Sequence, residues 1–235
     1  MSSEKNILLG ELDLSKVKGL LFDVDGTLSD TDDLMVSRLA NIIHPLGFLL
    51  NNDRDVKPVA RRLVMAVESP SNLLYNLADR LGLDNFVAKL LSSNARKKKL
   101  KQSQFLLIPN VGTMLDSLHP HFKLGVVSAR DAVSTNAFLK YFGLIDFFNV
   151  IVTGQTCQRT KPFPDPVIFA AESMGLRSEE CVMIGDTVVD IKAGKSAGAQ
   201  TVGVLCGFGT FREIKRAMPD LILSTTRQLS DILLP

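Results

Sequence analysis

Polar and charged residues stand at the points where short apolar runs of the chain end. The stretch "LLFDVDGTLSDTDD" at 20–33 shows the pattern, because its apolar run stops at two aspartates, Asp23 and Asp25, one residue apart. Similar residues follow three later runs, which makes the full set Asp23, Asp25, Ser128, Lys161, Asp186 and Asp190. Carboxylates, a hydroxyl and one ammonium group are the side chains that bind a divalent cation together with an anion.

The elements that must position these residues are short strands and helices in alternation. Continuous apolar runs rich in β-branched residues predict strands at 19–22, 124–127, 149–152, 181–184, 201–205 and 221–223. Helical spacing predicts helices at 111–118, 131–142, 165–175, 188–198 and 211–218. This alternation is typical of an α/β, Rossmann-like core of three layers, in which helices cover both faces of a parallel sheet. The carboxyl ends of parallel strands share one edge, so the six polar residues are expected to meet there.

One segment departs from this alternation. Between the first strand and the rest of the sheet, the apolar spacing is helical throughout, as in "DLMVSRLANII" and "NLLYNLADRLG". We therefore predict a core domain of residues 1–30 and 106–235 and a small all-helical cap domain, 31–105, inserted after the first strand. An inert helical bundle or a dimerisation surface is the alternative interpretation of the insert. The basic run at 96–101, "RKKKLK", is interpreted as a solvated helix end, with polyanion binding as its alternative.

Electrostatics points to a metal at the shared edge. Two carboxylates 4 Å apart repel by about 4 kcal/mol at an effective dielectric constant near 20. Lys161 can offset one negative charge, and a divalent cation can offset the rest. Oxygen ligands without histidine or cysteine nearby favour Mg²⁺ over zinc, and the anion that commonly meets Mg²⁺ and lysine together is phosphate.

Each motif also has a structural interpretation when it is taken alone. Two aspartates in a D-x-D pattern can cap a helix or form an Asx turn, and Ser128 can cap the helix that starts near Asp131. Lys161 can be a surface lysine, and "GDTVVD" can be a turn before a capped helix. An EF-hand is excluded, because Leu28 and Leu34 occupy the positions of its glycine and glutamate. The occurrence of all four motifs at successive strand ends favours one shared site.

Composition narrows the class of protein. The 235 residues are 46% hydrophobic, and 27 basic against 25 acidic residues give a net charge of only +2. No strong field therefore points to nucleic acid or an anionic membrane. Three widely spaced cysteines disfavour a disulfide framework, and no apolar run reaches the roughly 18 residues of a membrane span. We expect an unexported cytoplasmic protein, a monomer or homodimer, without nucleic-acid or membrane partners.

The motifs resemble those of the haloacid dehalogenase superfamily of phosphohydrolases. "DVDGTLSD" is similar to its first motif, "VVSAR" to the second, "KPFPDP" to the lysine motif and "IGDTVVD" to the acidic fourth motif, across residues 18–206. The helical insertion resembles the C1-type cap of phosphoglycolate phosphatase-like and β-phosphoglucomutase-like members. Two positions depart from the pattern: Ala129 stands where many relatives have asparagine, and Arg130 follows it beside the expected phosphate site.

The resemblance implies a mechanism and a role for each residue. Asp23 is expected to attack phosphorus and form an aspartyl-phosphate, while Asp25 protonates the leaving group and later activates water. The expected phosphate ligands are Gly26, Thr27, Ser128, Ala129 and Lys161. The expected Mg²⁺ ligands are Asp23, the backbone carbonyl of Asp25, and Asp186, with Asp190 as a further ligand or as support behind the ligands.

Three functions stay open at this point. The leading hypothesis is an enzyme, a Mg²⁺-dependent phosphatase that hydrolyses a small phosphorylated metabolite such as phosphoglycolate, a sugar phosphate or a nucleoside monophosphate. A phosphomutase of the β-phosphoglucomutase kind is the second, since the same two aspartates, Asp23 and Asp25, serve both reactions. A non-catalytic phosphate-binding regulatory protein is the third, although such proteins usually lack one of these aspartates.

Overall fold

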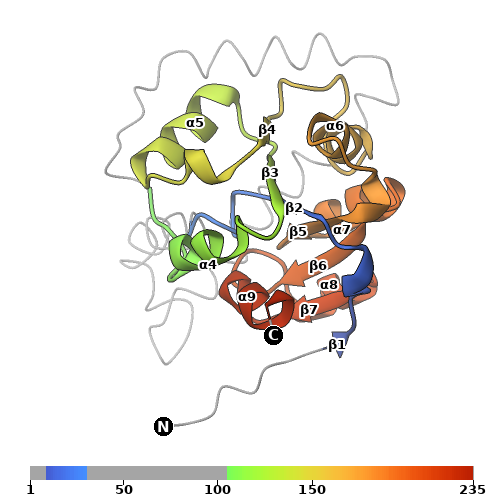
Figure 1. Ribbon diagram of the computed structural model, residues 1–235. Helices are drawn as coiled ribbons and strands as arrows, with labels where there is room; N and C mark the ends of the chain where they lie inside the picture. Colours follow the sequence, from blue (N-terminus) through green and yellow to red (C-terminus); the bar gives the residue numbers. More distant parts are fainter. Residues whose placement is uncertain (1–8, 31–104, 235) are drawn as a thin grey trace, which may run out of the picture. The chain divides into compact units, whose positions relative to one another are not determined.

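The computed structural model describes residues 9–30 and 105–234, which belong to one compact unit (Figure 1). Within them lies a seven-stranded sheet of order β1-β7-β6-β5-β2-β3-β4. The strands are β1 (Leu9–Gly10), β2 (Gly19–Phe22), β3 (Lys123–Val127), β4 (Val150–Val152), β5 (Cys181–Gly185), β6 (Gln200–Val204) and β7 (Leu221–Leu223). The six predicted strands are all present, and each is within one residue of its predicted bounds.

The sheet is parallel except at one edge. Strands β2 to β7 pair in parallel, as predicted for an α/β core, whereas β1 pairs antiparallel with β7. Strand β1 was not predicted, because two residues are too few to show a periodic pattern. This short strand gives β7 a second neighbour on the side away from β6, so it protects that edge from pairing with other chains.

Helices follow most of the strands, close to the predicted positions. They are α4 (Val111–Leu118), α5 (Ala132–Tyr141), α6 (Asp165–Ser173), α7 (Val188–Ser196), α8 (Phe211–Arg216) and α9 (Leu229–Leu233). Short 3₁₀ turns lie at Leu14–Lys16, Ile145–Phe147, Ser178–Glu180 and Thr226–Gln228. Helix α9 was not predicted, since its five residues are shorter than two helical turns. No helix in these described ranges is long and apolar enough to cross a membrane.

The helices cover both faces of the sheet, which completes the three layers (Figure 1). Along β2 the side chains alternate: Leu20 and Phe22 enter a cluster with residues of α4, α5 and α9, whereas Leu21 enters a second cluster with residues of α6 and α7. All four residues of β2 are buried. This explains why the strand is continuously apolar, since neither of its faces meets water.

The register of the central strands places the candidate residues side by side. Phe22 of β2 lies opposite Val126 of β3 on one side and opposite Ile184 of β5 on the other. The residues that follow these strands therefore emerge next to one another at the carboxyl edge. The predicted cap, 31–105, and the basic run at 96–101 lie outside the described residues, apart from Phe105, and both stay predictions.

Candidate active site

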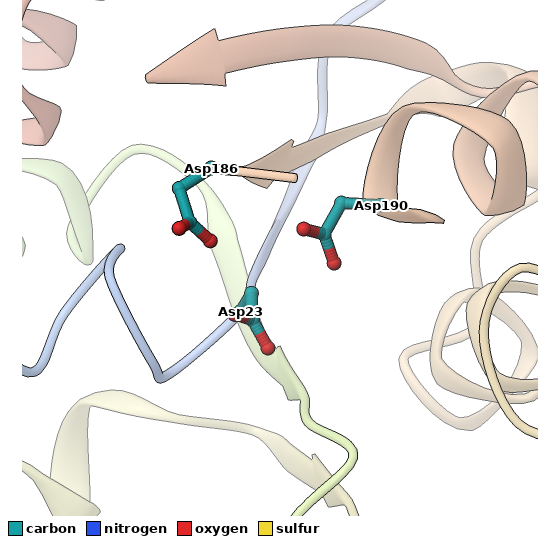
Figure 2. Close-up of side chains that lie close together, drawn as sticks. All are labelled: Asp23, Asp186 and Asp190. Carbon is teal, nitrogen blue, oxygen red and sulfur yellow. The ribbon is translucent and has the colours of Figure 1, made fainter. Parts of the chain in front are cut away.

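Three buried aspartates meet at the carboxyl edge of the sheet. Asp23 follows β2, Asp186 follows β5 and Asp190 lies in the first turn of α7, and the three side chains face a common space (Figure 2). One oxygen from each carboxylate lies within 4.8 Å of the others. The side chains are almost inaccessible, with exposed fractions of 7%, 0% and 1% for the three residues. Residues 163 positions apart in sequence are thus brought together, as expected from the strand ends.

Lys161 bridges two of these three aspartates, Asp23 and Asp190. Its ammonium nitrogen donates to Asp23 Oδ1 and to Asp190 Oδ1, each at 2.6 Å, and to the carbonyl of Val127 at 2.9 Å. The side chain is only 4% exposed. The interpretation of Lys161 as an ordinary surface lysine is therefore wrong. Three acceptors match the three N–H bonds of an ammonium group, so this buried cation is fully satisfied.

Asp186 is held by the backbone and closely surrounded by glycines. Its Oδ2 accepts a hydrogen bond of 2.7 Å from the amide of Phe208, in the loop after β6. A Cβ atom on Gly26 would lie 2.3 Å from this oxygen, and one on Gly207 would lie 2.1 Å from it. Gly26 also has a φ of +71°, which favours glycine. The glycine of the first motif therefore allows the late acidic loop to approach the early one.

Asp190 combines two tasks. Its Oδ2 accepts hydrogen bonds from the amide and the hydroxyl of Thr187, which closes a capping box at the start of α7. Its Oδ1 accepts from Lys161. The interpretation of "GDTVVD" as a turn before a capped helix is therefore also correct. The same carboxylate caps the helix and anchors the buried lysine.

Asp25 points to a different partner. Its carboxylate is outside the three-aspartate group and accepts a fork of hydrogen bonds from Arg130, from Nε to Oδ2 at 2.6 Å and from Nη2 to Oδ1. Arg130 was noticed in the sequence only as a departure from the motif. No sequence pattern links an aspartate to an arginine 105 positions away, although two residues that each follow adjacent strands are natural candidates for such a pair.

The remaining predicted residues lie in the turns after β2 and β3. Gly26 donates its amide to the carbonyl of Ser29 at 2.8 Å, and Thr27 is fully buried in the same turn. Ser128 continues β3 with a hydrogen bond from its amide to Val152, and its side chain is nearly buried. Ser128 does not cap the next helix, because Asp131 does so by accepting from the amide of Ser134. The carbonyl of Ala129 approaches Gly154 so closely that a Cβ there would lie 2.5 Å away.

The carboxylates at this edge carry more negative charge than Lys161 can neutralise. Burial, the largest effect, raises the pKa of Asp23 to about 7; Lys161 opposes this rise, and the Asp190 and Asp25 carboxylates add to it. Burial alone would lower the pKa of Lys161, but the Asp190 and Asp23 carboxylates outweigh it and raise that pKa, so the lysine stays cationic. The acids thus lack positive charge, and a hard divalent cation with oxygen ligands fits this donor set.

Comparisons with known proteins agree with this geometry. The model of the family described as haloacid dehalogenase-like hydrolase matches residues 20–204. Phosphoglycolate phosphatase of Nitrosococcus oceani is 28% identical, covering 94% of this chain and 98% of the relative. Pyrophosphatase PpaX of Bacillus pumilus is 30% identical, with coverages of 93% and 96%.

A solved structure leads to the same family. A haloacid dehalogenase-like hydrolase from Bacteroides fragilis superposes with a TM-score of 0.66 at 25% identity, over 91% of this chain and 99% of the other. The α/β fold and the hydrolase class expected from the motifs are thereby confirmed. The chain belongs to the haloacid dehalogenase-like hydrolases.

Proposed function

We propose that this hydrolase is a Mg²⁺-dependent phosphatase that cleaves a small phosphorylated metabolite through an aspartyl-phosphate on Asp23. The observation that carries the proposal is the buried Asp23 carboxylate, which is paired with Lys161 and lies beside Asp186 and Asp190 at the carboxyl edge of the sheet. A nucleophile, a fixed cation and a metal-ligand set in one place are the components that phosphoryl transfer needs.

In the first step, a carboxylate oxygen of Asp23 attacks phosphorus as the bond from phosphorus to the leaving oxygen breaks. Lys161 donates to Asp23 Oδ1 and holds the carboxylate in one orientation. Ser128 lies at the adjacent strand end, where its hydroxyl would donate to a phosphoryl oxygen. Orientation and a fixed positive charge together lower the barrier without any need for the chain to rearrange.

Asp25 acts as the general acid and then as the general base. As the phosphorus–oxygen bond breaks, its carboxyl proton passes to the leaving alkoxide. In the second step, a water attacks phosphorus, the bond to Asp23 breaks, and the proton of that water returns to Asp25. The side chain of Asp25 is 31% exposed, whereas Asp23 is nearly buried, so Asp25 is the acid that an incoming leaving group can reach.

The bound Mg²⁺ would supply positive charge to the phosphoryl oxygens. We assign it to Asp23, Asp186 and the backbone carbonyl of Asp25. Asp190 is assigned as a residue that supports the site and not as a metal ligand, because its two oxygens already accept hydrogen bonds from Lys161 and from Thr187. In this assignment Asp190 holds the lysine in place, while Asp186 would be a ligand of the metal.

The names of the relatives suggest which substrates to test first. One relative is named for phosphoglycolate and another for pyrophosphate. The purified protein with Mg²⁺ should release inorganic phosphate from at least one member of a panel that contains these two compounds, sugar phosphates and nucleoside monophosphates. Glucose 1-phosphate belongs in the panel, because the appearance of an isomer in place of free phosphate would indicate the mutase.

A direct test looks for the covalent intermediate. Acid-quenched enzyme, digested and analysed by mass spectrometry, should carry one phosphoryl group on the peptide that contains Asp23. The variant Asp23→Asn should remain folded but carry none and show no turnover. Near-normal rates in Asp23→Asn would contradict the proposed function.

A further inference from the structure

Arg130 and Asp25 form a two-point ion pair across adjacent strand ends. Arg130 Nε donates to Asp25 Oδ2 at 2.6 Å, and Nη2 donates to Oδ1. A guanidinium that meets a carboxylate side-on, through two of its three nitrogens, fixes the plane of the carboxylate as well as its position. A lysine at this position would supply the charge without the fork.

The arginine itself is fixed from several directions. Its amide donates to Ser128 Oγ at 3.2 Å, and its carbonyl accepts from the amide of Gly154 at 2.8 Å. The guanidinium carbon lies 5.5 Å from the ring centre of Phe138, a fully buried residue of α5. With 17% of its side chain exposed, Arg130 is a preorganised and largely desolvated donor.

We propose that Arg130 is a positioning residue for Asp25, which it holds in the orientation needed to pass a proton to and from the leaving oxygen. This inference rests on the function proposed above. An ionised carboxylate has about four lone-pair sites, and the fork uses only two of them. The remaining sites stay available for the proton that Asp25 gives to the leaving alkoxide and later takes from water. Arg130 therefore acts through Asp25: it forms no bond to the reacting atoms and transfers no proton.

Two phosphate monoesters whose alcohol parts carry no charged group separate this role from others. Glycerol 2-phosphate releases an alkoxide, which needs a proton as it leaves, whereas p-nitrophenyl phosphate releases a stable phenolate, which does not. The value of kcat/KM covers the steps up to leaving-group departure. In Arg130→Gln, we expect kcat/KM to fall by about 10- to 100-fold for glycerol 2-phosphate and by less than about 3-fold for p-nitrophenyl phosphate, a part of the 10²–10⁴ attributed to general acid catalysis.

Further variants show whether the loss of kcat/KM in Arg130→Gln arises through Asp25. Asp25→Asn should give the same dependence on the leaving group, and Arg130→Gln should add less than about 3-fold to it, since residues that act as one unit are not additive. Arg130→Lys should lie between the wild type and Arg130→Gln. Arg159→Gln is the control, because Arg159 also donates through Nε and Nη2 to an aspartate, although both bonds go to the single oxygen Oδ1 of Asp165, and it also stacks on a ring.

Each outcome of these measurements supports or overturns the positioning role of Arg130. The ratio of the two kcat/KM values is measured on one preparation, so it does not depend on how much of a variant is folded. Equal losses for both esters, or no loss, would overturn the positioning role of Arg130 while leaving the phosphatase intact. A wild-type protein inactive on both esters with Mg²⁺ would overturn this inference, and one that is also inactive on every member of the substrate panel would overturn the proposed function.

Discussion

The buried lysine offers the sharpest test of how this site is held together. Lys161→Met removes the ammonium group but keeps an unbranched apolar stem. Two carboxylates, Asp23 and Asp190, then lose the same cation, and the carbonyl of Val127 loses a donor. Removing one partner of a buried ion pair costs about 3–5 kcal/mol, mainly because the other charge is left buried and unpaired. At 2–4 °C per kcal/mol for a chain of this size, Tm should fall by roughly 6–20 °C.

The control is a lysine whose ion pair has nearly the same length but whose side chain is exposed to solvent. Lys18 pairs with Glu180 at 2.7 Å, compared with 2.6 Å for Lys161 and Asp23, yet the Lys18 side chain is 61% exposed and that of Lys161 only 4%. Because water screens an exposed pair, Lys18→Met should change the unfolding free energy far less than Lys161→Met.

The assay is urea and thermal unfolding at pH 8 with EDTA, followed by circular dichroism. Repeating it at pH 5 should reduce the loss in Lys161→Met, because the carboxylates that lost their cation can then be neutralised by protons. Equal losses of unfolding free energy in Lys161→Met and Lys18→Met would refute the argument that burial decides the strength of the pair.

The other predictions concern protons, the metal and the close glycine contacts. The folded state raises the pKa of Asp23 from 3.8 to about 7, so the folded protein binds more protons in this range, and the stability from this group should be lost as pH rises towards 7 without Mg²⁺. Added Mg²⁺ should therefore raise Tm more at pH 8 than at pH 5, and equal shifts would contradict this. EDTA should abolish phosphate release, and excess Mg²⁺ should restore it. Gly207→Ala places a Cβ 2.1 Å from Asp186 Oδ2 and should cost about 1–3 kcal/mol of unfolding free energy, whereas Gly112→Ala in α4 meets nothing closer than 3.9 Å and should cost nothing. Similar urea midpoints for these two variants would argue against the crowding at Asp186.

Much of the core was predictable because its strands are apolar on both faces. The pattern of β2 needs only Leu20, Leu21 and Phe22 to be buried, and the parallel arrangement then requires the residues after each strand to meet at one edge. The convergence of Asp23, Ser128 and Asp186, which directly follow β2, β3 and β5, follows from topology alone. Strand β1 and helix α9 were missed because their lengths carry too little periodicity.

The side-chain pairings were less accessible to sequence reasoning. Which carboxylate Lys161 meets depends on rotamers and loop paths, and the pairing of Lys161 with both Asp23 and Asp190 appears only in three dimensions. The fork between Arg130 and Asp25 was also not predictable, because a sequence motif describes neighbours along the chain and not contacts in space. The capping role of Asp131 was hidden because Ser128 is an equally good cap by residue type.

The dual attachment of Asp190 has a consequence for mutational surveys. A substitution there loosens the first turn of α7 and the lysine together, so the amount of protein in the cell and its turnover number should decline in parallel. In Asp23→Asn, turnover should be lost while abundance falls less, because Lys161 still has Asp190 and the carbonyl of Val127 as acceptors. A survey that records both quantities for every variant, with any ester that the enzyme hydrolyses, would thus sort the aspartates by task.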